Sequence, residues 1–143
     1  MTVRGISHVT FVVADLERTA RLFREGLGAR EVYDSAGREH SLSREKFFVL
    51  GGLWLVAMQG APLAERSYRH VAFVVDAADL PGYATRLQAL GVEVLPGRGR
   101  IEGEGASLYF HDHDNHLFEL HAGTLDGRLA AYAAAAVLPA GPG

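Results

Sequence analysis

HVTFVV, at residues 8–13, occurs a second time with one substitution as HVAFVV, at residues 70–75. Each copy leads into a stretch of helical character, then past a Leu-Gly pair into a strand-like run. A repeat of this kind indicates that one structural unit is used twice. We therefore expect one domain built from two similar modules, residues 4–60 and 66–123.

Each module is expected to contain one helix and four strands. Asp15 and Asp79 precede the two helical stretches, and Gly28 and Gly91 follow them as C-terminal caps. The predicted elements are helices at 16–27 and 80–90, second strands at 30–33 and 92–95, and last strands at 53–60 and 117–123. The third and fourth strands of each module would pair as hairpins, with the second hairpin turning at 113–115. The fold class is α+β, with two βαβββ modules.

The composition excludes several classes of function. The 143-residue chain has no cysteine, so disulfides, thiolate metal sites and a cysteine nucleophile are ruled out. Its net charge is −3, and no dense basic stripe indicates nucleic acid as a partner. We expect no membrane partner and a cytoplasmic location. Residues 129–143 are rich in alanine and are expected to form a frayed helix with a partly disordered end.

The repeat places two histidines at equivalent positions of two equivalent strands. Side chains alternate along a strand, so His8, Thr10 and Val12 share one face, and His70 belongs to the same set in the second copy. A lone histidine at a strand start is usually structural. A duplicated pair would converge if the modules pair about a pseudo-twofold axis, and imidazole is the commonest metal ligand.

A carboxylate completes this set in the last strand. Glu119 lies between hydrophobic neighbours, where burial is costly unless the charge is paired or metal-bound. Together with His8 and His70 it makes a set of two histidines and one carboxylate, suited to Mn, Fe or Zn. The repeat puts Val56 opposite Glu119, so a symmetric fourth ligand is missing. An open coordination position is typical of a catalytic metal site.

A second histidine cluster offers an alternative metal site. Four histidines crowd the last predicted hairpin: His111, His113, His116 and His121. The first two form an H-x-H pair, which can bind zinc from one face of a strand. Because His113 lies in the predicted turn, strand geometry does not fix its position as a ligand of this alternative site.

Several motifs together resemble the fosfomycin-resistance epoxide hydrolases of the vicinal-oxygen-chelate (glyoxalase/bleomycin-resistance) superfamily. The resemblance covers about residues 4–132. It is carried by GISHVT at 5–10, YRHVAF at 68–73, SLYF at 107–110 and DNHLFELH at 114–121. SLSREKFF, at 41–48, is similar to the branch that adds water to fosfomycin and not a thiol.

The resemblance implies a paired-module homodimer that inactivates fosfomycin by opening its epoxide with water. His8, His70 and Glu119 would be the metal ligands, for Mn²⁺ or another divalent metal, and no thiol cosubstrate would be needed. Glu45 would be the general base. In the dimer, His8 and Glu45 of one chain would face His70 and Glu119 of the other. The substrate-binding residues would be Thr10, Trp54, Tyr68, Arg100, Ser107, Tyr109 and Arg128.

Three other functions remain open at this point. A thiol transferase of the same superfamily would act on fosfomycin with glutathione or another thiol. An Fe(II) dioxygenase would use the same ligand set with oxygen and a catechol. A drug-sequestering protein of this fold would generally lack the three metal ligands. Fold alone does not decide among them.

Overall fold

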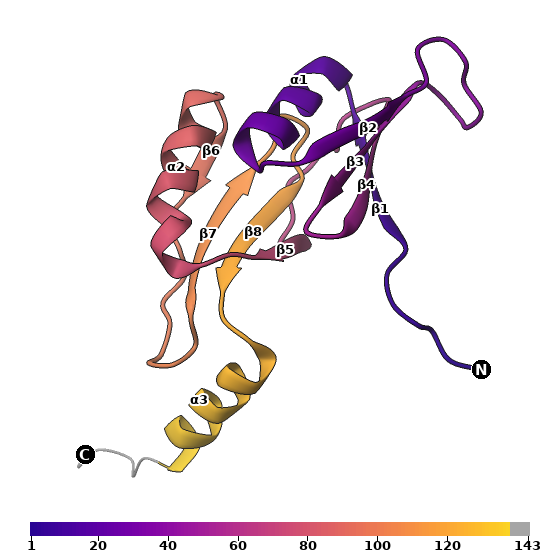
Figure 1. Ribbon diagram of the computed structural model, residues 1–143. Coiled ribbons are helices and arrows are strands. Elements are labelled where there is room, and N and C mark those ends of the chain that lie inside the picture. Colours follow the sequence, from indigo (N-terminus) through magenta and orange to yellow (C-terminus); the bar gives the residue numbers. More distant parts are fainter. Residues whose placement is uncertain (138–143) are drawn as a thin grey trace.

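Each copy of the repeat forms one four-stranded mixed sheet in the computed structural model, which describes residues 1–137 (Figure 1). The first sheet has the order β1-β4-β3-β2 and the second the order β5-β8-β7-β6. The strands of the first are β1 (His8–Val13), β2 (Arg30–Asp34), β3 (Glu45–Leu50) and β4 (Leu53–Gln59). Those of the second are β5 (His70–Val74), β6 (Glu93–Leu95), β7 (Ala106–His111) and β8 (Leu117–Ala122).

The helices begin close to where the sequence predicts them. α1 (Leu16–Arg21) is capped by Asp15, whose side chain accepts the Arg18 amide at 3.0 Å. It continues as a wider π turn, η1 (Leu22–Gly26), in place of one regular helix to residue 27. α2 (Leu80–Ala89) follows a 3₁₀ turn, η2 (Ala77–Asp79), and the Asp79 side chain makes no capping bond. Gly28 and Gly91 end the helices with φ of 78° and 77°, as their cap positions require.

The strand register confirms that the modules are equivalent. In each sheet the first strand runs parallel to the fourth, and the third and fourth strands form a hairpin. Thr10 pairs with Val56 in the first sheet, and Ala72 pairs with Glu119 in the second. Val56 and Glu119 therefore occupy equivalent positions, as the sequence alignment of the two modules predicts.

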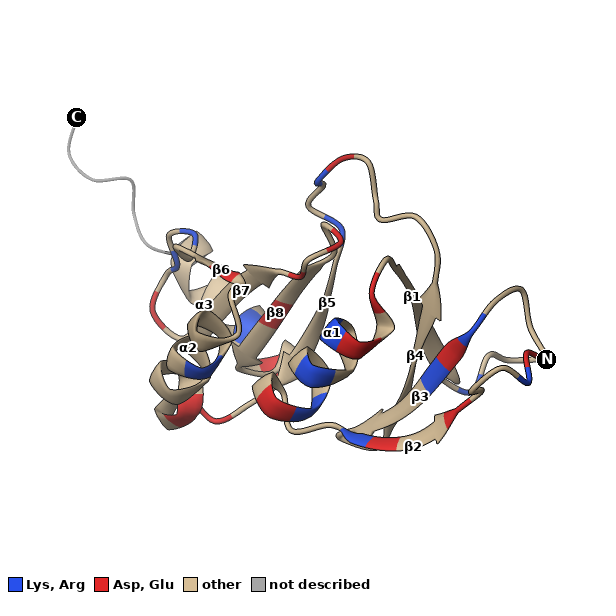
Figure 2. Ribbon diagram, turned by 90° about the horizontal axis from the view of Figure 1, so that it is seen from above, with Lys and Arg blue, Asp and Glu red and all other residues tan. Residues whose placement is uncertain are grey.

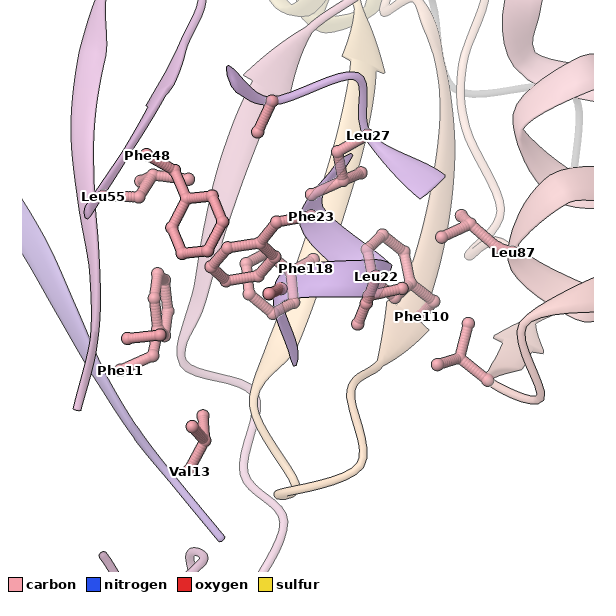
Figure 3. Close-up of a cluster of buried hydrophobic side chains, with 14 of the residues drawn as sticks. Phe11, Val13, Leu22, Phe23, Leu27, Phe48, Leu55, Leu87, Phe110 and Phe118 are labelled. Atoms are coloured by element: carbon pink, nitrogen blue, oxygen red, sulfur yellow. The ribbon is translucent and has the colours of Figure 1, made fainter. Parts of the chain in front are cut away.

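One hydrophobic core joins the two modules (Figure 3). Phe118 of the second sheet is fully buried, and its ring contacts Phe11 and Phe23 of the first module at centroid distances of 5.0 and 6.2 Å. η1 approaches α2 so closely that a Cβ on Gly26 would lie 3.1 Å from Leu87. Figures 1 and 2 both show α1 and α2 next to each other, so the helices cover one side of the sheets.

Phe118→Ala is expected to lower the free energy of unfolding by about 3–5 kcal/mol, because it opens a cavity where the two modules meet. Urea denaturation monitored by circular dichroism measures the change. Leu42→Ala, at a side chain that is almost wholly exposed, is the control and should change the value by less than about 0.5 kcal/mol. Equal losses in the two variants would contradict a shared core.

The C-terminal helix lies outside this shared core. α3 (Leu125–Val137) follows β8 and projects from the end of the sheet (Figure 1). The helical part of the predicted tail is thus confirmed, whereas its predicted disordered end, residues 138–143, lies outside the described residues. Between residues 1 and 137, no helix is long and apolar enough to cross a membrane.

Candidate metal centre

His70 and Glu119 face each other on neighbouring strands of the second sheet. His70 begins β5, and Glu119 lies in the middle of β8. The Nε2 atom of His70 is 3.0 Å from Oε2 of Glu119. The carboxylate is buried, with only 5% of the residue exposed. Two of the three predicted ligands therefore lie side by side.

The hydrogen bonds of His70 test whether this pair fits a metal. Nδ1 of His70 lies 2.7 Å from the carbonyl oxygen of Tyr68, which can only accept, so Nδ1 carries the proton. With Nδ1 held by this carbonyl, Nε2 is directed at Oε2 of Glu119, 3.0 Å away. An imidazole nitrogen and a carboxylate oxygen this close together can both bind one cation. Orientation of the second ring nitrogen by a carbonyl is typical of metal-bound histidines.

The other oxygen of Glu119 is held by polar neighbours. Oε1 accepts a hydrogen bond from Ser107 Oγ at 2.5 Å and one from Arg100 Nη2 at 3.1 Å. Burial acts to raise the pKa of Glu119, but hydrogen bonding by Ser107 and Tyr109 and the nearby histidines lower this pKa overall. Glu119 is therefore a carboxylate at neutral pH, with Oε2 left to face His70.

Arg100 brings positive charge into the same site. Its Nη2 atom also donates to Ser107 Oγ at 2.7 Å and to Tyr109 Oη at 3.2 Å. Its Nη1 atom is buried and makes no hydrogen bond within residues 1–137; the Glu104 carboxylate lies 3.7 Å away. A guanidinium with an unused donor in such a position suits an anionic ligand.

His121 belongs to this site, although the sequence placed it only in the alternative cluster. Its Nδ1 atom lies 2.7 Å from Ser107 Oγ, and its Nε2 atom lies 3.4 Å from Arg128 Nη2. The Ser107 hydroxyl donates its hydrogen bond to Glu119. Nδ1 of His121 therefore donates to Ser107 Oγ, and Nε2 accepts from Arg128. Burial and the nearby arginines lower the pKa of His121 despite the opposing charge of Glu119, which favours this neutral form.

Tyr68 and Tyr109 form one wall of the site. Their rings lie 4.9 and 5.7 Å from the His70 ring, and their hydroxyl oxygens are 3.4 Å apart. Burial, together with the neighbouring Tyr68 and Glu119, raises the pKa of Tyr109, so its hydroxyl stays protonated. All six predicted residues of the second module, and Arg128 of α3, are thus linked through contacts with one another or with His121.

The remaining predicted residues lie on the first sheet. His8 and Thr10 are exposed on β1, and the His8 ring lies 4.5 Å from the ring of Trp54 on β4. Glu45 on β3 pairs with Met58 on β4, which pairs with Val12 on β1. Since Val12 is on the same face as His8 and Thr10, Glu45 is on that face too. This face of the first sheet is the counterpart of the one that carries His70 and Glu119.

Glu45 is a largely buried residue whose carboxylate has no polar partner within residues 1–137. Only 8% of the residue is exposed, and its side chain makes no hydrogen bond or ion pair within the described part of the chain. Its backbone is fixed by Ser35, which accepts the Glu45 amide at Oγ and donates its own amide to the Glu45 carbonyl. Its oxygens are not among the enclosed, unpartnered atoms of residues 1–137, so the carboxylate keeps access to solvent and can accept a proton.

Ion pairs on the opposite face anchor the strand that carries Glu45. Arg44 bonds to Asp34 at 3.1 Å, and the buried Lys46 lies within 3.3 Å of carboxylates of Glu17, Glu31 and Asp34. Figure 2 shows basic (blue) and acidic (red) residues alternating at the start of β3. The hydrogen bond from Arg44 lowers the pKa of Asp34 to about 2, against the opposing effect of burial.

Asp34→Asn is expected to make the fold less sensitive to acid. The pKa of Asp34 is depressed in the folded chain, so its contribution is complete above its ordinary pKa of 3.8 and is lost as pH falls toward 2. Between about pH 4 and pH 2, the free energy of unfolding should depend less steeply on pH in the variant than in the wild type. The difference in slope should be smaller than about 1.4 kcal/mol per pH unit, which is the limit for one proton. Urea titrations at several pH values measure this slope. Asp76→Asn, at an exposed residue, should leave the slope unchanged.

The two halves of the predicted site do not meet within one chain. Among residues 1–137, no three His, Asp or Glu side chains gather closely enough to hold a metal ion. His8 contacts Trp54, whereas His70 contacts Glu119. The alternative histidine cluster is not formed either, because His116 pairs with Asp112 at 2.8 Å and His121 belongs to the site above.

Comparison with known proteins identifies the family to which these two repeated sheets belong. Residues 5–120 match the Glyoxalase/Bleomycin resistance protein/Dioxygenase superfamily. The fosfomycin resistance protein FosX of Mesorhizobium japonicum is 56% identical over 90% of this chain and 92% of its own length. The chain belongs to the FosX family.

A solved FosX structure agrees in fold as well as in sequence. A variant of FosX from Listeria monocytogenes, complexed with Mn(II) and 1S,2S-dihydroxypropylphosphonic acid, superposes with a TM-score of 0.83 and is 46% identical. The match covers 92% of this chain and 99% of that chain. The metallothiol transferases are more distant: FosB of Shouchella clausii is 38% identical over 91% of this chain and 88% of its own length.

Proposed function

We propose that this protein inactivates fosfomycin by Mn²⁺-dependent addition of water to its epoxide, giving the vicinal diol. The observation that carries this proposal is the position of His70 Nε2, held by its Nδ1 hydrogen bond and lying 3.0 Å from Oε2 of Glu119. Membership of the FosX family supplies the substrate, since a FosX relative holds Mn(II) together with a dihydroxypropylphosphonic acid. That compound is the diol expected when water opens the fosfomycin ring.

The metal would be held by His8, His70 and Glu119, which provide two imidazole nitrogens and a carboxylate. When bound, Mn²⁺ would act as a Lewis acid on the oxirane oxygen and favour cleavage of its carbon–oxygen bond. Val56, the buried counterpart of Glu119 in the first module, cannot coordinate. Coordination positions are thus left open for the substrate.

A homodimer would complete the site. His8 and Glu45 of one chain would face the partner's His70 and the partner's Glu119. Exposed side chains beside both half-sites support this pairing: Val12 on β1 is 40% exposed, Val74 on β5 is 84% exposed, and Tyr68, just before β5, is 65% exposed. Apolar surface of this kind is typical of an interface between chains.

The polar groups around Glu119 would bind the phosphonate. Arg100 offers a buried guanidinium with an unused donor, and Arg128 is joined to Ser107 through His121. Ser107 and the protonated hydroxyl of Tyr109 would add neutral donors. Tyr68, Thr10 and Trp54 would border the oxirane, the last two from the partner's first sheet. Such contacts hold the reacting carbon in position for attack.

Glu45 would act as the general base. Its carboxylate has no competing partner, so it can accept a proton from a water molecule that attacks the carbon next to phosphorus. The new carbon–oxygen bond forms as the ring bond at that carbon breaks. The oxirane oxygen keeps the electron pair of the broken bond and takes up a proton, so the product is a neutral pair of neighbouring hydroxyls.

Phosphorus NMR of fosfomycin with the purified protein and Mn²⁺, with and without glutathione, tests the proposal. We expect conversion to the diol in both samples and no thiol adduct. Conversion only in the presence of glutathione would replace the proposed hydrolase by a thiol transferase. Absence of any conversion would refute fosfomycin as the substrate.

A further inference from the structure

A cavity of about 380 Å³ lies beside the metal half-site on the same face of the second sheet. Its walls include Tyr68, Tyr109, Leu95 and Leu117, and His111 also lines it. The size is within the range of small-molecule pockets. Fosfomycin carries only a methyl group on its outer ring carbon, so the proposed reaction leaves this cavity, here named the His111 cavity, without a role.

His111 is the polar group that this cavity leaves unsatisfied. The residue is 8% exposed, and neither ring nitrogen forms a hydrogen bond within residues 1–137. Its position on β7 is fixed by pairing with Leu117, which itself pairs with His70 on β5. His111 and His70 therefore occupy one row across the sheet and point to the same side.

The charges around the cavity favour an uncharged ligand group. Arg66 is paired with Glu93 at 2.8 Å, and Arg98 is paired with Glu104. These arginines are already neutralised, so they give the cavity little attraction for a second anion. Burial, with a further contribution from Arg66, lowers the pKa of His111. The neutral ring then offers one hydrogen-bond donor and one acceptor.

The cavity and the half-site share a wall. Tyr68 and Tyr109 both line the cavity, and both rings contact His70. Tyr109 and His111 are two residues apart on one strand, a separation of about 7 Å. A substituent of about two or three heavy atoms on a substrate held beside Tyr109 therefore spans the distance to His111.

We propose that the His111 cavity is a subsite for the outer-carbon substituent of epoxyphosphonates, and that it selects substituents ending in a hydroxyl group. The hydroxyl both donates and accepts, so it can pair with a nitrogen of His111 when the ring, whose nitrogens are enclosed in the empty cavity, turns toward it. Leu95 and Leu117 line the path of the carbon atoms before the hydroxyl. This inference rests on the proposed hydrolysis and names a wider substrate class for the same site.

Two epoxyphosphonates test the subsite, one with a 2-hydroxyethyl and one with an n-propyl group in place of the methyl group of fosfomycin. In the wild-type holoenzyme, kcat/KM for the hydroxyethyl compound should exceed that for the propyl compound by about tenfold, the effect of one well-placed hydrogen bond. His111→Leu should abolish or reverse this ratio. His111→Gln, which keeps a donor and an acceptor, should retain a preference for the hydroxyl. Each ratio is taken within one variant, so differences in folded fraction cancel.

An unchanged ratio in His111→Leu, or a wild-type preference for the propyl compound, would overturn the inference. Fosfomycin, assayed in parallel, reports separately on the proposed hydrolysis. A binding measurement covers the case in which no epoxide is opened. The ¹⁵N ring resonances of His111 are assigned by their loss in His111→Leu. They should shift when the phosphonate diol with the 2-hydroxyethyl group is added, but not when the diol with the propyl group is added. If neither diol shifts these resonances, the subsite is refuted, whatever the result of the hydrolysis assay.

Discussion

Glu45→Gln is expected to lower the rate of fosfomycin hydrolysis by about 10²–10⁴-fold, the usual contribution of a general base. Glutamine has nearly the same shape but cannot take the proton of the attacking water. The Glu45 carboxylate forms no hydrogen bond or ion pair in the described chain, so the change removes no structural contact. Mn²⁺ affinity and the free energy of unfolding should therefore stay close to those of the wild type.

Phosphorus NMR gives the rate, and isothermal titration calorimetry gives the Mn²⁺ affinity. Glu25→Gln is the matched control, because Glu25 lies on the surface and, within residues 1–137, forms its ion pair with Arg21 alone. It should hydrolyse fosfomycin at the wild-type rate. Full activity in Glu45→Gln would remove Glu45 from the mechanism, whereas loss of Mn²⁺ binding in that variant would assign it to the metal centre.

Mixing two inactive variants is expected to restore activity if two chains share each site. His8→Ala and Glu119→Ala each remove a proposed ligand from both sites of a homodimer, so each alone should be inactive. In the heterodimer of the two variants, one site receives both substitutions and the other receives neither. Co-expression with different affinity tags and two-step purification isolate this heterodimer. Its rate should be about half that of the wild-type dimer.

A second heterodimer provides the control. His8→Ala and Glu45→Gln lie on the same sheet, so pairing these two variants leaves one defect in each site. No activity should return in that combination. Failure of the His8→Ala and Glu119→Ala pair to recover activity would contradict a site built from the first sheet of one chain and the second sheet of another.

The repeat is what made the fold predictable from sequence. HVTFVV and HVAFVV became β1 and β5, and the alignment of Val56 with Glu119 agrees with the strand register. Local details were less predictable. The π turn η1 packs against Leu87 of α2 at Gly26, and a 3₁₀ turn precedes α2, where the Asp79 side chain makes no capping bond. Such contacts join distant parts of the chain.

The candidate site was predictable only in part for the same reason. Strand alternation put His70 and Glu119 on one face, and they lie 3.0 Å apart. The bridging position of His121 depends on Ser107 from the neighbouring strand and Arg128 from α3. No spacing along the sequence encodes that convergence. The partnerless state of Glu45 and His111 is likewise a property of the packed chain.

The separation of the two half-sites also affects how activity would depend on protein concentration. A site that needs two chains exists only after association, so its abundance follows mass action. At chain concentrations far below the dissociation constant of the dimer, doubling the amount of protein would raise the number of working sites about fourfold. Protection from the drug would then rise steeply with expression, and a cell making slightly too little protein would gain almost none.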